Sequence, residues 1–183
     1  MSEEMVIRHC SPTLAGMKTG SMFSCSFGEI SDLRSFIRRL NQLLVKKGLR
    51  VLPLRIQENR ALIYVFRPKR LKQDLNHATS VRLLEERQYD VNSSDRCIVH
   101  LMQRLKDNEE FPHEIGLFLG YPPEDVEGFI ENKAADFKYV GTWKVYGDAT
   151  IARRTFHKYK KCTSVYCTQF ANGKSIERLT VAE

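Results

Sequence analysis

Two cysteines and a histidine–glutamate pair are the residues of this sequence best suited to chemistry. Cys10 and Cys162 lie far apart in the chain, and His113 directly precedes Glu114. A thiolate is a nucleophile and a metal ligand, and a nearby cation such as Lys18 favours the thiolate form. Histidine and glutamate serve in acid–base catalysis, although neighbours on a helix point about 100° apart. The four residues are therefore the catalytic candidates of a thiol-dependent or metal-handling enzyme. The alternative is that the cysteines are buried and unreactive.

The spacing of the histidines and cysteines argues against a metal site formed by one segment. His157, Cys162 and Cys167 follow one another at intervals of five residues, which on an α-helix turns each side chain by about 140°. Cys97 and His100 share one side of a helix, but two ligands are too few for a zinc site. The sequence contains no CxxC pair. We therefore predict no metal site within any one segment, while a site assembled across the fold stays open, and the sequence identifies no cofactor.

The basic residues suggest a second chemistry, the binding of an anion. The net charge is +7, and the stretch 28–75 holds twelve Lys or Arg residues against four Asp or Glu residues. A further basic stretch covers 149–162, and Lys18 lies in a turn-like segment between Gly16 and Gly20, where backbone amides can also meet an anion. Such surfaces can equally serve solubility alone. The candidate ligand-binding residues are Lys18, Arg153, Arg154, Lys158 and Lys161.

The stretch 111–132, FPHEIGLFLGYPPEDVEGFIEN, predicts two short helices that meet at a sharp corner. Pro112 and Pro123 suit the first position of a helix, and Gly120 suits the left-handed residue that ends one. The apolar residues of each helix recur at i, i+3 and i+4, which places them on one face. These residues are Ile115, Phe118 and Leu119 in the first helix, and Val126, Phe129 and Ile130 in the second.

The same corner is compatible with a helix-turn-helix, and a DNA-binding regulator is therefore another alternative. The charges disfavour it, because 111–132 contains five acidic residues and no Lys or Arg. Affinity for DNA depends on cations that neutralise phosphates. We therefore do not expect nucleic acid to bind through this stretch.

Three segments resemble one family of proteins. They are RHCSPTLAGMKTGSMFSC at 8–25, FPHEIGLFLGYPPEDVEGFI within 111–132, and GTWKVYGDATIARRTFHKYKKC at 141–162. Together they are similar to an uncharacterised bacterial family, a domain of unknown function found mainly in anaerobic Gram-positive bacteria. The resemblance covers nearly the whole chain. It implies no activity, cofactor or catalytic residue.

Periodicity and turn residues predict an α+β fold, with a small sheet packed by several helices. Its clearest strands form an antiparallel hairpin at about 49–67, in which Pro53 indicates an edge or a bulge. Further strands are expected at 5–9, 22–27 and 138–146. Ser11 and Pro12 are expected to open a brief helical turn. Besides the corner at 111–132, helices are expected at 29–47, 68–75, 79–88, 93–107, 149–171 and 175–181.

The length of 183 residues, with 42% hydrophobic and 28% charged residues, predicts a single globular domain over 1–183. No apolar run approaches the ~20 residues of a membrane span, and the first residues do not resemble a signal peptide. The odd number of five cysteines favours reduced thiols in the cytoplasm. The function expected first is a cytoplasmic binding module for an anionic small molecule or an acidic protein, without a membrane partner. Whether the protein is an enzyme stays open.

Overall fold

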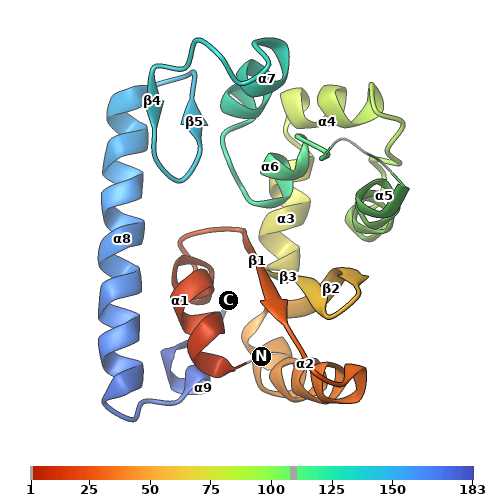
Figure 1. Cartoon of the computed structure of the whole chain (residues 1–183). Helices are drawn as coiled ribbons and strands as arrows, with labels where there is room; N and C mark the ends of the chain where they lie inside the picture. Colours follow the sequence, from red (N-terminus) through yellow and green to blue (C-terminus); the bar gives the residue numbers. More distant parts are fainter. Residues whose placement is uncertain (1, 108–110) are drawn as a thin grey trace. The chain divides into compact units, whose positions relative to one another are not determined.

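The computed structural model describes residues 2–107 and 111–183 (Figure 1). These residues adopt the expected α+β fold, with helices, a three-stranded antiparallel sheet and a two-stranded antiparallel sheet. The chain divides into two compact units. The first extends up to Lys69 and includes Tyr159–Glu183, and the second is Arg70–Lys158.

The first unit contains the three-stranded sheet, with strand order β1-β3-β2. The predicted hairpin is confirmed, because β2 and β3 pair antiparallel from Gln57–Arg60 onward. The register shifts between Pro53 and Arg55, on an edge strand. Proline has no amide donor for a ladder, which explains the edge position and the irregularity. The strands are β1 (Gly20–Ser26), β2 (Arg50–Gln57) and β3 (Arg60–Phe66).

One face of this sheet forms the core of the first unit. Alternate residues of β3, namely Ala61, Ile63 and Val65, join apolar residues from three helices in one buried cluster. The period of two along the strand directs them to one face. The helices are α1 (Glu3–Leu14), α2 (Ile30–Leu44) and α9 (Ile176–Leu179), and a short 3-10 helix, η1 (Val45–Lys47), follows α2 and ends at the left-handed Gly48.

The expected strand at 5–9 is wrong, because these residues belong to helix α1. The Ser2 side chain caps the helix by accepting a hydrogen bond from the Met5 amide. Glu3 and Glu4 occupy the first turn, where the helix dipole favours negative charge. Ser11 and Pro12 consequently lie near the end of this helix and do not open a new one. The buried residues keep a helical period: Val6, Ile7, Cys10 and Leu14.

The buried guanidinium of Arg67 attaches the C-terminal segment to the end of α1. It donates hydrogen bonds to the carbonyl oxygens of Thr13, Leu14 and Val181 at 2.8, 2.9 and 2.8 Å. The Val181 amide also donates to the Leu14 carbonyl at 3.0 Å. The last carbonyls of a helix have no partner within it, and a cation there is favourable. Residues far apart in sequence therefore meet at this arginine.

The second unit is mainly helical. Most of its elements begin and end close to the expected residues, and α3 and α8 continue into the first unit. Asp148 caps α8, since its Oδ1 accepts hydrogen bonds from the amides of Thr150 and Ile151 at 2.7 and 3.0 Å. The helices are α3 (Pro68–Leu75), α4 (Ala78–Glu85), α5 (Ser94–Asp107), α6 (Ile115–Phe118), α7 (Pro123–Glu131) and α8 (Ala149–Ala171).

The single strand expected at 138–146 is wrong, because the structure has a short hairpin there. β4 (Tyr139–Val140) pairs antiparallel with β5 (Lys144–Val145). The chain turns between them at Gly141, where a Cβ atom would lie 2.1 Å from the ring of Phe156. Only glycine permits the turn to approach that ring so closely.

The predicted corner at 111–132 is present, although its first helix is shorter than expected. α6 begins at Ile115 and not at Pro112, because the preceding residues form tighter turns. Gly120 has the expected left-handed φ of 70°, and Pro123 opens α7. None of the helices in residues 2–107 and 111–183 combines the length and the apolar character that a bilayer span requires.

Candidate functional site

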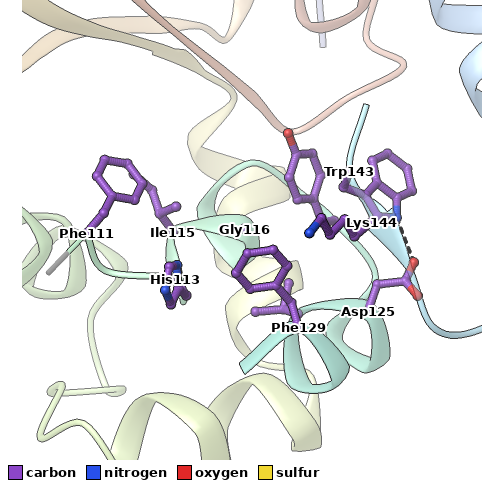
Figure 2. A pocket seen from close by; sticks show the side chains of 10 residues that line it. Phe111, His113, Ile115, Gly116, Asp125, Phe129, Trp143 and Lys144 are labelled. Carbon is purple, nitrogen blue, oxygen red and sulfur yellow. Dashed lines mark hydrogen bonds between the residues drawn. The ribbon is translucent and has the colours of Figure 1, made fainter. Parts of the chain in front are cut away.

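A pocket of about 340 Å³ lies beside the α6–α7 corner in the second unit (Figure 2). Three segments line it: the residues before and in α6, helix α7, and the start of β5. Five of the ten lining residues carry aromatic side chains or an imidazole, so the pocket has an unusually ring-rich wall. The lining residues are Phe111, His113, Ile115, Gly116, Tyr121, Asp125, Val126, Phe129, Trp143 and Lys144.

The carboxylate of Asp125 holds one wall of the pocket in place. Its side chain is 4% exposed, and Oδ2 accepts a hydrogen bond from the Trp143 indole at 2.6 Å. Oδ1 accepts from the backbone amides of Tyr146 and Gly147, each at 2.7 Å. A buried carboxylate with three donors is well compensated, and hydrogen bonds to charged groups are the strong ones. Asp125 therefore attaches the β4–β5 hairpin to α7.

The Trp143 ring is supported on two sides by other aromatic rings. Tyr121 stacks on it, with 4.8 Å between the ring centroids, and Phe156 of α8 meets it edge-on at 4.5 Å. Phe156 in turn stacks on Tyr139, with 6.1 Å between centroids. Offset and edge-to-face arrangements are the favourable ones for aromatic pairs. The indole is consequently held in one orientation at the pocket wall.

Lys144 brings a positive charge to a largely apolar pocket. Its ammonium donates a hydrogen bond to the Ala134 carbonyl at 2.7 Å. It also lies 4.7 Å from the ring centroid of Phe137 and 5.7 Å from that of Phe129, within the range of cation–π attraction. Figure 2 shows the lysine beside the Phe129 ring. An ammonium has three donors, so Lys144 can donate to a ligand as well.

Two glycines allow the elements around the pocket to pack closely. A Cβ atom at Gly116 would lie 2.8 Å from Cγ2 of Val126, and one at Gly128 would lie 2.5 Å from Cγ of Tyr146. Both distances are shorter than carbon atoms tolerate without displacement. Gly116 therefore sets the distance between α6 and α7, and Gly128 sets the distance between α7 and the hairpin.

His113 and Glu114 do not form an acid–base pair. The imidazole lines the pocket and meets the Phe129 ring edge-on at 4.9 Å. The Glu114 carboxylate is buried on another side, where it accepts a hydrogen bond from the Tyr89 hydroxyl at 2.8 Å and pairs with Arg104 at 2.7 Å. Burial and the Glu114 charge raise the pKa of Tyr89, so its hydroxyl remains a donor. Glu114 therefore belongs to a buried cluster with Tyr89 and Arg104.

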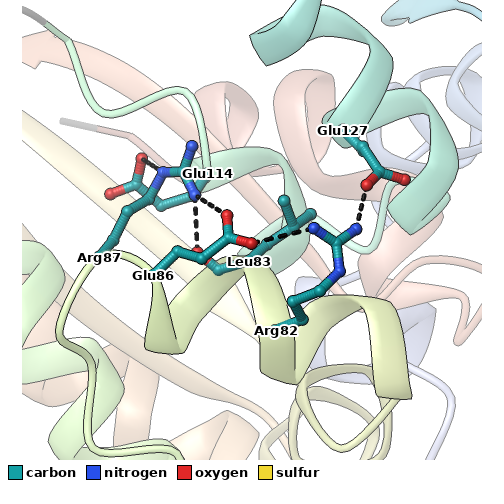
Figure 3. A network of polar contacts seen from close by, with 6 residues as sticks. All are labelled: Arg82, Leu83, Glu86, Arg87, Glu114 and Glu127. Carbon is teal, nitrogen blue, oxygen red and sulfur yellow. Dashed lines mark hydrogen bonds and ion pairs between the residues drawn. The ribbon is translucent and has the colours of Figure 1, made fainter.

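One other acidic residue of the corner, Glu127, is also paired within the second unit (Figure 3). Arg82 of α4 pairs with Glu127 of α7 and, at 3.0 Å, with Glu86. Arg87 donates to the Leu83 carbonyl at 2.8 Å and lies 3.7 Å from Glu114. These contacts join α4 to α7 and to the start of α6.

A family model matches residues 6–180 of the chain, and the family is described as a protein of unknown function (DUF3793). The chain belongs to this family. The resemblance carried by three sequence segments is thereby confirmed. No curated protein and no solved structure matches the chain. Membership of DUF3793 carries no activity over to this chain, so any function must be argued from the site itself.

In this DUF3793 chain, the Cys10 thiol is less acidic than a free thiol despite Lys18, contrary to the expectation. Cys10 is fully buried, and burial raises its pKa more than the positive charge of Lys18 lowers it. Burial in turn lowers the pKa of Lys18 to about 8. Cys162 is half-buried, and burial raises its pKa as well. A neutral, buried thiol is a poor nucleophile.

The remaining sequence candidates lie on α8, and they are exposed. Arg153 places its guanidinium 4.4 Å from the ring centroid of Tyr139. The amides of Ile151 and Thr150 lower the pKa of the Asp148 carboxyl, and the nearby charge of Arg154 adds a smaller effect in the same direction. Among the described residues, no group of three or more His, Cys, Asp or Glu side chains gathers in a way that could hold a metal ion.

The sequence alone does not identify the residues that form the pocket. Asp125 occupies the first turn of α7, where an acid complements the helix dipole, and Lys144 carries no local signal. Trp143 is the single tryptophan of the sequence. Its rarity was the one available signal, because nothing local in the sequence pairs Asp125 with an indole 18 residues later.

Proposed function

We propose that this DUF3793 member is a ligand-binding protein whose pocket takes a small aromatic molecule bearing one anionic group. The observation that carries the proposal is the ring-lined pocket of about 340 Å³ with the Lys144 ammonium at its wall. Small-molecule sites are typically apolar clefts of about 300–1,000 Å³ with a few placed polar groups. The pocket has both the size and this composition.

The preference for an aromatic ligand follows from the lining. Phe129 and Trp143 stand on different elements and contribute ring faces and edges to one space. Aromatic rings prefer offset or edge-to-face contact with other rings, and each such pair contributes about 0.5–1.5 kcal/mol beyond the burial of area. The wall is also rigid, because Asp125 and Tyr121 hold the indole. A preformed site loses little entropy when a ligand binds.

The preference for an anionic group follows from the charges at the pocket. Among the described residues that line it, Lys144 is the only lysine or arginine. Asp125, whose carboxylate lines the described part of the pocket, accepts hydrogen bonds at both oxygens from the protein itself. Its charge is therefore directed toward Trp143 and the backbone. A carboxylate on the ligand can pair with Lys144 and gain a charge-assisted hydrogen bond.

This proposal keeps the expected anionic ligand and places it at different residues. We also propose a cytoplasmic location, in keeping with the reduced state of the cysteines: none of the five, all of them in the described part of the chain, forms a disulfide. Buried thiols with raised pKa values lend no support to the alternative of a thiol-dependent enzyme.

Calorimetric titration with matched ligands tests the proposed function. We expect 2-naphthoate to bind, its neutral analogue 2-naphthamide to bind at least 10-fold more weakly, and decanoate to bind more weakly than 2-naphthoate. Lys144→Met should remove the difference between naphthoate and naphthamide, because it removes the cation and keeps an apolar chain of similar length. Phe129→Ala should weaken both aromatic ligands.

Lys138→Met is the matched control, because Lys138 lies on the same hairpin, is exposed and does not line the pocket. It should bind both ligands as the unmodified protein does. Equal affinity for naphthoate and naphthamide in the unmodified protein would contradict the anionic preference. Absence of binding by all three compounds at millimolar concentration would refute the proposed ligand class.

A further inference from the structure

We propose that the exposed face of α8 binds the phosphate backbone of a nucleic acid duplex without reading its sequence. This surface, the basic face, comprises five cations and one histidine of a single helix. It is separate from the pocket and from the corner at 111–132. Its residues are Arg153, Arg154, His157, Lys158, Lys160 and Lys161, all of them exposed.

The helical period gathers these side chains on one side of α8. At about 100° per residue, the six positions cover an arc of about 160°. Ala152, the only buried residue of α8, lies about 160° from the centre of that arc. Phe156, which packs against Trp143, lies on the same side as Ala152. The basic face therefore points away from the packed side, and it depends on no element other than α8.

The density of charge on this face matches a polyanion. From Arg153 to Lys161 the helix axis advances about 12 Å, at about 1.5 Å per residue. Five cations in that length give about one positive charge every 2.5 Å, and α8 contains no Asp or Glu. Duplex DNA carries one negative charge per about 1.7 Å of its axis. A row of this density is complementary to a phosphate backbone, because its spacing lies between the about 1.7 Å per charge of the duplex and the about 3.4 Å per charge of one strand.

The contacts of the face favour phosphates over bases. Bases that bind without pairing usually stack on exposed aromatic rings. The rings closest to the face, Tyr139 and Phe156, are half-buried and stack on each other, and Arg153 covers Tyr139. Lysines act as point charges and do not need a fixed partner geometry. A duplex held by its backbone meets these conditions better than a single strand.

Fluorescence anisotropy with a 20-base-pair duplex DNA of arbitrary sequence tests this inference. We expect a dissociation constant of about 10⁻⁶ M in 50 mM salt, similar for two unrelated sequences, and affinity that falls steeply with salt. The triple variant Lys158→Gln, Lys160→Gln, Lys161→Gln should bind at least 10-fold more weakly. The slope of log K against log salt concentration should be less steep by about 2 to 3, since each phosphate contact adds about 0.9 to that slope.

The control is a triple variant with the same change in net charge at exposed residues elsewhere: Arg34→Gln, Arg38→Gln, Lys72→Gln. It should retain the affinity of the unmodified protein within 3-fold. Equal losses in the two triple variants would show that net charge alone is responsible and would overturn the inference. So would absence of duplex binding in 20 mM salt, or equally tight binding of poly-L-glutamate at matched charge, which would identify an acidic protein as the partner. Melting curves of both variants establish that they are folded.

Discussion

The Asp125 carboxylate illustrates how one buried side chain can position a binding wall. It is 4% exposed and accepts hydrogen bonds from Trp143, Tyr146 and Gly147. A hydrogen bond to a charged group contributes about 1.5–3 kcal/mol, and donors left unsatisfied add a further cost. Its identity as an acid in the first turn of a helix could be read from the sequence, but its partners could not.

Asp125→Ala should lower the free energy of unfolding by about 3 kcal/mol, because three donors lose their acceptor. Urea titration followed by the emission of Trp143 measures this directly, since the protein has one tryptophan. Emission of the folded variant should also shift to longer wavelength as the indole loses its fixed position. Glu124→Ala, at the exposed neighbouring residue, should change stability by less than about 0.5 kcal/mol. A loss of similar size in both variants would contradict the role of Asp125.

The lowered pKa of Lys18 predicts that the stability of the protein depends on pH. Burial lowers its pKa in the folded protein to about 8, against an ordinary value of 10.5. Between these values the unfolded chain binds more protons at this residue, so its contribution to stability rises with pH. Above about pH 10.5 the burial of Lys18 costs no stability, because the residue is neutral in both states. As pH falls through 8 the free energy of unfolding decreases by about 3 kcal/mol, since the unfolded chain takes up the proton more readily. Cys10 acts in the opposite direction above pH 9, since burial raises its pKa.

Urea unfolding of the unmodified protein and of Lys18→Met at several pH values from 7 to 10 isolates this contribution. We expect the variant to be the more stable of the two at pH 7 and the gap between them to close toward pH 10. The Cys10 contribution is common to both proteins and largely cancels. A gap that is constant over this range would show that Lys18 does not titrate as described.

The corner between α6 and α7 depends on how closely two short helices can approach. A helix of four residues such as α6 has little stability of its own, so packing against α7 must hold it. Gly116 permits this packing, because a Cβ atom there would lie 2.8 Å from Val126 and 3.2 Å from Tyr121. The turn chemistry of Gly120 and Pro123 was evident in the sequence, whereas this contact was not.

Gly116→Ala should destabilise the second unit by about 1–3 kcal/mol, since overpacking forces neighbouring side chains out of position. It should also weaken binding of 2-naphthoate, because Val126 and Tyr121 line the same pocket. Chemical denaturation and calorimetry measure the two effects. Gly28→Ala is the control, because a Cβ atom there would meet no atom within 4 Å. Unchanged stability of Gly116→Ala would mean that the corner can widen at no cost.

Two elements were predicted wrongly. Residues 5–9 are mostly apolar, as in a short strand, but the Ser2 cap and the Glu3–Glu4 pair at the helix N-terminus place them in α1. The stretch 138–146 has the composition of a strand, but the chain turns at Gly141, whose lack of a side chain allows the close approach to the Phe156 ring. In the first case the deciding signal is local and lies just before the stretch. In the second, the deciding contact comes from another element.

Both ends of the chain contribute to the first unit, while the second unit is one continuous segment. The C-terminal segment is attached through Arg67, which donates to Val181, and through Ile176 and Leu179 in the core cluster. Whether the chain unfolds as the single domain predicted from its length can therefore be tested by removing one end.

Deletion of residues 172–183 should open the first unit and leave the second intact. The buried cysteines report on each unit separately: Cys10 and Cys25 in the first, Cys97 in the second. We expect the deletion to accelerate alkylation of Cys10 and Cys25 by at least 10-fold and to leave Cys97 and Trp143 emission unchanged, as measured by mass spectrometry and fluorescence. Equal acceleration of all three thiols would indicate one cooperative domain, as the length of the chain predicts.

Most helix ends, the β2–β3 hairpin, the corner glycine and the α8 cap could be predicted from the sequence, because each depends on residues a few positions apart. The pairing of Asp125 with Trp143, of Glu114 with Arg104 and of Arg67 with Val181 could not, since 18, 10 and 114 residues separate the partners. Local hydrogen bonds and periodicity determine where an element begins and ends. The tertiary structure decides which side chains enclose a pocket and which charges are buried as pairs. These contacts join segments that are distant in sequence, and local signals do not specify them.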